Sequence, residues 1–191
     1  MESAMWFYRV GNRMKELYSN FRGYLYLNLS EIKWVFVFGV LFLVLFLLLY
    51  KKRHAKSRWG LVILSLNCAF IFVMTLFGRA IGETYRYALM PFESYLMVFS
   101  EGNMENLLQI LMNIVMYIPI GFLLPCCFEL FERYRYVILL AVMSSTGIEL
   151  VQGIFKIGLF EVDDIINNTI GAAVGVAIYA LFHKWMRKNR L

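Results

Sequence analysis

Apolar residues along this chain fall into five long runs that are separated by polar or charged segments. The runs extend approximately over residues 32–50, 60–77, 106–128, 136–155 and 165–185. A helix needs about 20 mostly apolar residues to cross a bilayer, and none of the runs has the period-two alternation of barrel strands. The pattern therefore predicts an all-α integral membrane protein with about five transmembrane helices.

The segment before the first run, residues 1–31, mixes apolar and aromatic positions with basic ones. This mixture is typical of an amphipathic helix that lies in the membrane interface, although a disordered or partner-bound tail fits it equally well. We therefore divide the chain into an N-terminal amphipathic segment, residues 1–31, and a transmembrane helical domain, residues 32–191.

The distribution of charge predicts an orientation in the membrane. The net charge is +6, and five basic residues crowd into residues 51–58. Short basic loops stay in the cytoplasm, which places the C-terminus in the cytoplasm as well and residues 79–105 outside. Because the basic residues flank apolar runs instead of forming an aromatic-interleaved patch, we expect membrane lipids and no nucleic acid as partners.

Three of the predicted helices carry polar stripes at one depth. With helical spacing, the stripes are Asn106, Gln109, Asn113 and Tyr117, then Ser145, Glu149 and Gln152, then Asp163, Asp164, Asn167 and Asn168. A charged side chain costs about 2.5 to 3.5 kcal/mol at the bilayer centre, so Glu149 should face the bundle interior, with Arg79, Arg86 or Lys156 as candidate partners. Helix–helix hydrogen bonding would explain a single polar pair, but three stripes favour a pocket on the extracytoplasmic side.

These residues form the candidate site. We predict that the ligand-binding residues are Arg86, Asn113, Glu149, Gln152, Asp163, Asp164 and Asn167. The two histidines are far apart and no His/Cys cluster has metal-ligand spacing, so we expect neither a metal nor a cofactor. Gly171 and Gly175 have the GxxxG spacing of close helix packing, which also makes a homodimer conceivable.

The same residues give the chain a resemblance to the VanZ-like family of small bacterial membrane proteins. The matching stretches are Pro91-Phe92 after Arg86, then NIVMYIPIGFLLP, SSTGIELVQ and FEVDDIINNTIGAAVG. The chain departs from the family pattern at Ala88, where an asparagine is usual, and near Lys156, where an arginine is usual. The resemblance implies a bacterial cell membrane protein associated with low-level resistance to teicoplanin, a lipoglycopeptide antibiotic.

Three functions compete for this site. The favoured one is a binding protein whose outer pocket engages the lipoglycopeptide or a lipid-linked component of the cell envelope. The second is an intramembrane enzyme that acts on a lipid-linked substrate through Glu149, Asp163 and Asp164, although metal-dependent enzymes of this kind normally use more carboxylates. The third is a small transporter, against which five spans without a repeat argue.

Overall fold

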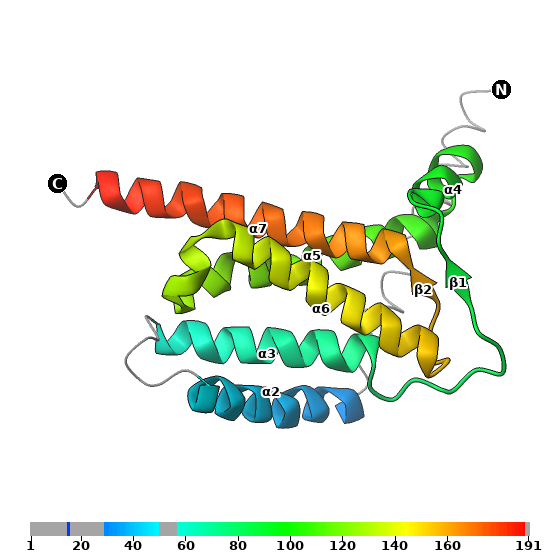
Figure 1. Ribbon diagram of the computed structural model, residues 1–191, viewed down its shortest axis with the longest axis horizontal. Helices are drawn as coiled ribbons and strands as arrows, with labels where there is room; N and C mark the ends of the chain where they lie inside the picture. The colour runs from blue at the N-terminus through cyan, green and yellow to red at the C-terminus, as the bar shows by residue number, and fades with distance from the viewer. Residues whose placement is uncertain (1–14, 16–28, 50–56, 190–191) are drawn as a thin grey trace.

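Five helices in the computed structural model are long and apolar enough to cross a membrane. The structure describes residue 15 and residues 29–49 and 57–189. The five helices are α2 (Leu29–Leu49), α3 (Arg58–Thr75), α5 (Met104–Cys127), α6 (Tyr134–Ile154) and α7 (Val162–Lys188). Their axes are roughly parallel to one another, except that the axis of α6 is tilted (Figure 1). The predicted all-α membrane fold is therefore confirmed, whereas most of the predicted N-terminal segment and the basic residues 51–56 lie outside the described residues.

Short elements cover one end of this bundle. They are β1 (Tyr87–Ala88), α4 (Glu93–Glu101) and β2 (Phe160–Glu161), while the 3-10 helix η1 (Glu129–Glu132) lies at the other end. The two strands pair in parallel, with Tyr87 opposite Phe160 and Ala88 opposite Glu161. This pairing joins the loop after α3 to the segment between α6 and α7 (Figure 1).

Helices α5 and α7 pack with their backbones in contact because glycines occupy the seam. A Cβ atom added at Gly121, Gly171 or Gly175 would lie 2.0 to 2.2 Å from a carbonyl oxygen of the facing helix. Small residues permit this approach in membrane helices. The face of α7 that carries Gly171 and Gly175 is therefore covered by α5 and is not available for a dimer contact.

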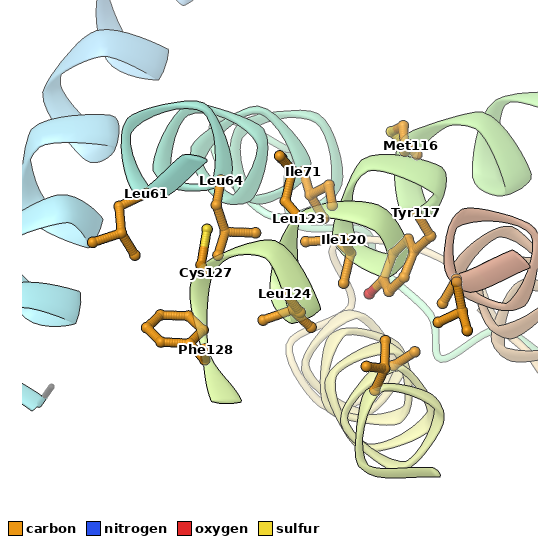
Figure 2. Close-up of a cluster of buried hydrophobic side chains, with 14 residues drawn as sticks. Leu61, Leu64, Ile71, Met116, Tyr117, Ile120, Leu123, Leu124, Cys127 and Phe128 are labelled. Atoms are coloured by element: carbon orange, nitrogen blue, oxygen red, sulfur yellow. The ribbon is translucent and has the colours of Figure 1, made fainter. Parts of the chain in front are cut away.

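The apolar core lies where α3 and α6 both approach α5. Figure 2 shows Leu64 and Ile71 of α3 near Leu123 and Leu124 of α5, while Leu61 lies nearer to Cys127. Helix α3 otherwise packs on α2, and α6 packs mainly on α7, so α3 and α6 barely touch each other. The bundle thus has a closed side, α5 against α7, and an open side, between α3 and α6.

Candidate functional site

A cavity of about 700 Å³ lies at the end of the bundle where α3 and α6 end and α5 and α7 begin. Its polar lining consists of Gln109 and Asn113 from α5, Glu149 and Gln152 from α6, Glu161 from β2, and Asp164 and Asn168 from α7. Exposed residues between 79 and 86 also line it, so the cavity reaches the molecular surface. The three predicted polar stripes therefore converge on one space.

Glu149 is the most deeply buried carboxylate of the cavity, with an exposed fraction of 2%. Its Oε2 accepts a hydrogen bond from the backbone N–H of Glu161 over 2.9 Å. A buried carboxyl group within a membrane helix is costly unless it is hydrogen-bonded or protonated. This bond supplies such a partner, and it also ties the end of α6 to the residue that precedes α7.

Gln109 connects two further carboxylates. Its Nε2 donates to Glu161 and also to Oδ1 of Asp164, the latter over 3.1 Å. Burial and the neighbouring Asp164 raise the pKa of Glu161, the hydrogen bond from Gln109 and the charge of Arg86 oppose the rise, and the net pKa is about 7. The carboxyl group of Glu161 therefore changes charge close to neutral pH.

Two buried amides that line the cavity have polar atoms without a partner. Among the described residues, no group meets full hydrogen-bond geometry with Nδ2 of Asn113 or with Oδ1 of Asn168, although the side chain of Asn113 lies close to the carboxylate of Asp164. The other amide atom of Asn168, Nδ2, donates to Oγ of Ser145 over 2.7 Å. A buried polar group left unsatisfied costs about 1 to 3 kcal/mol. The cavity lining therefore contains one amide donor and one amide acceptor whose hydrogen-bonding capacity is not fully used.

The structure brings five of the seven predicted site residues into this cavity. They are Arg86, Asn113, Glu149, Gln152 and Asp164. Asp163 and Asn167 instead hold α4. The carboxylate of Asp163 accepts from the backbone N–H groups of Phe92 (2.5 Å) and Ser94 (2.8 Å), and Asn167 accepts from the hydroxyl of Tyr95. Consecutive residues of a helix point about 100° apart, which explains why Asp163 contacts α4 while Asp164 faces the cavity.

The predicted cationic partners of Glu149 lie at the mouth of the cavity. Arg79 donates to the backbone oxygen of Met74 over 3.0 Å. Lys156 donates to the backbone oxygen of Glu83 over 3.2 Å, and its ammonium group lies 4.4 Å from the ring centre of Tyr85. Arg79 therefore bonds to the last turn of α3, and Lys156 contacts the loop that forms the rim.

Glu161 is a site residue that the hydropathy pattern missed. It precedes the last apolar run and belongs to a two-residue strand, so no periodicity marks it. A signal was nevertheless available, because Glu161 and Asp164 are three residues apart and that spacing places two side chains on one helix face. Gln109 was recognised as part of a stripe but not as a site residue.

Gln152 has a structural contact in addition to its place in the cavity. Its Nε2 donates to the backbone oxygen of Thr75 over 2.9 Å, which joins the end of α6 to the end of α3. Within residues 15, 29–49 and 57–189, no group of three His, Cys, Asp or Glu side chains is placed to hold a metal ion. The expectation that no metal or cofactor takes part stays a prediction.

Five membrane-length helices and a polar cavity at one end define a multi-pass membrane protein. The chain belongs to the VanZ/LLP1 family, which matches residues 34–183, and the predicted resemblance is therefore confirmed. It is 31% identical over 93 residues to Protein VanZ of Enterococcus faecium, a match that covers 47% of this chain and 53% of that protein. The chain thus aligns with about half the length of this relative. No solved structure matches.

Proposed function

We propose that the protein gives bacteria low-level protection against teicoplanin-type lipoglycopeptides by engaging the drug, or a lipid-linked component of the cell envelope, in the polar cavity. Membership of the VanZ/LLP1 family and the similarity to Protein VanZ support this role. The observation that carries it is the cavity of about 700 Å³, in which buried amides retain unsatisfied polar atoms. Such an arrangement favours a polar ligand over an empty site.

The orientation that we propose brings the cavity to the outer face of the cell membrane. The opposite end of the bundle carries Arg133, Arg135, Lys184, Arg187 and Lys188. Basic residues next to membrane spans mark the cytoplasmic side. The C-terminus is then cytoplasmic, and the cavity faces the compartment in which lipoglycopeptides and lipid-linked wall intermediates meet the membrane.

The carboxylates and amides have complementary roles in this proposal. Glu149 and Asp164 accept hydrogen bonds from hydroxyl or amino groups of the ligand, while Asn113 donates to one of its oxygens. Hydrogen bonds that involve a charged partner contribute about 1.5 to 3 kcal/mol each. Asp163 and Asn167 act indirectly in this scheme, because they hold α4 in place.

A second candidate function is intramembrane catalysis on a lipid-linked substrate, and Glu161 is the observation that favours it. General acid–base catalysis works best when the pKa of the catalytic group lies near the operating pH, and the pKa of Glu161 is about 7. The carboxyl group of Glu149 accepts a hydrogen bond from the backbone N–H of Glu161, so the two glutamates are neighbours in the cavity. Transport has less support, because five described spans without an internal repeat do not suit alternating access.

Drug susceptibility tests the main proposal. A susceptible Gram-positive host would express the unmodified protein, Glu149→Gln and the control Glu129→Gln, an exposed glutamate at the opposite end of the bundle. At matched membrane levels, we expect the unmodified protein and the control to raise the inhibitory concentration of teicoplanin several-fold with little effect on vancomycin. Glu149→Gln should lose this protection. Protection against neither drug by the unmodified protein would refute the proposal.

Incubation of the purified protein with lipid-linked wall intermediates separates binding from catalysis. The binding proposal expects the substrate to be recovered unchanged. A product that forms with the unmodified protein and disappears in Glu161→Gln would establish the catalytic alternative, because that substitution removes the titrating group and keeps its size.

A further inference from the structure

A second, apolar pocket of about 230 Å³ opens on the side of the bundle where α3 and α6 barely touch. Phe72 of α3, Ile120 of α5 and Ile148 of α6 are among its lining residues. Its two hydroxyl groups, on Tyr117 and Ser144, lie 3.3 Å apart and can bond to each other. This pocket, which we call the groove, therefore presents a predominantly apolar wall.

The groove adjoins the polar cavity. Both spaces are lined by Ile148. On α5 the cavity ends at Met116 and the groove begins at Tyr117. On α6 the groove extends to Ser144, which lies more than one turn from Glu149. Helices α5 and α6 thus place the groove deeper than the cavity, whereas the two overlap in depth at the end of α3, where Leu76 lines the groove and Met74 lines the cavity.

The two compartments suit two parts of one molecule. Among the groups that line the cavity, the buried carboxyl group of Glu149 and Oδ1 of Asn168 can accept hydrogen bonds, and Nδ2 of Asn113 can donate one. A hydroxyl group meets both demands, and an amino group meets the first. The groove lies at the depth of the membrane interior, which consists of hydrocarbon chains. Burial of such a chain against apolar walls is favourable.

We propose that the cavity and the groove together form one site for a single-chain amphiphile. Its hydroxyl- or amino-bearing head occupies the polar cavity, and its hydrocarbon chain lies between α3 and α6. This inference rests on the proposed function, since it names the ligand class of the same cavity. The acyl chain of a lipoglycopeptide and the chain of a lipid-linked sugar share this chemistry.

Photolabelling tests where the chain lies. The full-length protein in nanodiscs of phosphatidylglycerol would be exposed to dodecyl glucoside with a diazirine at the end of its chain, and labelled peptides would be mapped by mass spectrometry. We expect labels on the segments that line the groove. Ser144→Trp should lower this labelling about tenfold, because the indole occupies the space of the chain. The control is Met143→Trp, which changes the preceding, 62% exposed residue and should leave the labelling unchanged.

Labels spread evenly over outward helix faces, or equal labelling of Ser144→Trp and Met143→Trp, would overturn the proposal. A test without substitutions covers the case in which Ser144→Trp fails to fold. Excess unlabelled dodecyl glucoside should abolish labelling, whereas glucose without a chain and dodecyl phosphocholine should not. Equal competition by dodecyl phosphocholine would overturn the assignment of the head.

The two proposals fail in different ways. Protection against teicoplanin without groove labelling would refute the amphiphile site and leave the proposed function intact. Groove labelling without protection would refute the proposed function and leave the amphiphile site intact. Displacement of the probe by teicoplanin would identify the drug as a source of the ligand, and displacement by a host lipid extract would identify an envelope lipid. Displacement by neither would count against the amphiphile site.

Discussion

The closed and open sides of the bundle are built on opposite principles. Between α5 and α7, Gly121, Gly171 and Gly175 remove the side chains, so that backbones meet. Between α3 and α6, side chains remain but the helices barely touch, and Gln152 reaches across to Thr75 at one end. Close backbone packing leaves little room for adjustment, whereas a side-chain gap can adapt. The difference indicates that the closed side is the framework and that the open side is the part that can adapt in shape.

Breaking the closed side should have the largest effect. Gly171→Ala would place a Cβ atom 2.2 Å from the backbone oxygen of Ile114, so α5 and α7 must separate. We expect a loss of stability of about 3 kcal/mol or more, the upper range for overpacked cores. Thermal unfolding of the purified protein in detergent measures it. Gly147→Ala is the control, because no atom lies within 4 Å of its added Cβ, and similar melting of both variants would contradict the framework role.

Removing the link across the open side should have an intermediate effect. Gln152→Leu keeps the side chain large but abolishes its hydrogen bond to Thr75. We expect a loss of about 1 kcal/mol in the free energy of unfolding, the usual contribution of one such bond. The variant should also label faster with the groove probe because the ends of α3 and α6 are freed. Leu150→Ala changes an exposed residue of the same turn, and an equal effect of that change would argue against the link.

The smallest effect on stability should come from the titration of Glu161 at the cavity. The folded state raises the pKa of Glu161 from its ordinary 4.5 to about 7, so it favours the protonated form. The stability that this carboxyl group contributes is therefore complete below about pH 4.5 and is lost as the pH rises through about 7. After allowance for partial exposure we expect less than about 1 kcal/mol. Unfolding at several pH values should show the decline in the unmodified protein relative to Glu161→Gln, and parallel curves would refute it.

Hydropathy was sufficient to predict the five spans because each helix is longer and more apolar than any alternative structure would require. It was also sufficient to predict that Asn113, Glu149 and Asp164 meet at one depth. Depth follows from position along a helix, but the direction of a side chain depends on which neighbour each helix face meets. For that reason Asp163 and Asn167, adjacent to cavity residues in the chain, were assigned to the pocket although they contact α4.

Helix α4 could not be predicted from its own sequence. It has nine residues, and the side chain of its N-cap residue, Phe92, makes no hydrogen bond to the first turn. Asp163, 71 residues further along the chain than Phe92, supplies that contact. Local capping rules consider neighbours within a few residues, so a cap contributed by another helix leaves no local signal.

This remote cap has a consequence for the order of biogenesis. Phe92 has a φ of 65°, a left-handed conformation that costs a non-glycine residue about 1 kcal/mol or more when nothing sustains it. The acceptor that sustains it belongs to α7, which is translated after the other four described transmembrane helices. While the ribosome is still producing residues before 162, the segment of α4 has crossed or reached the membrane without its cap. The end of the bundle that carries the polar cavity is thus completed only when α7 is in place, so the insertion of α7 fixes the position of α4.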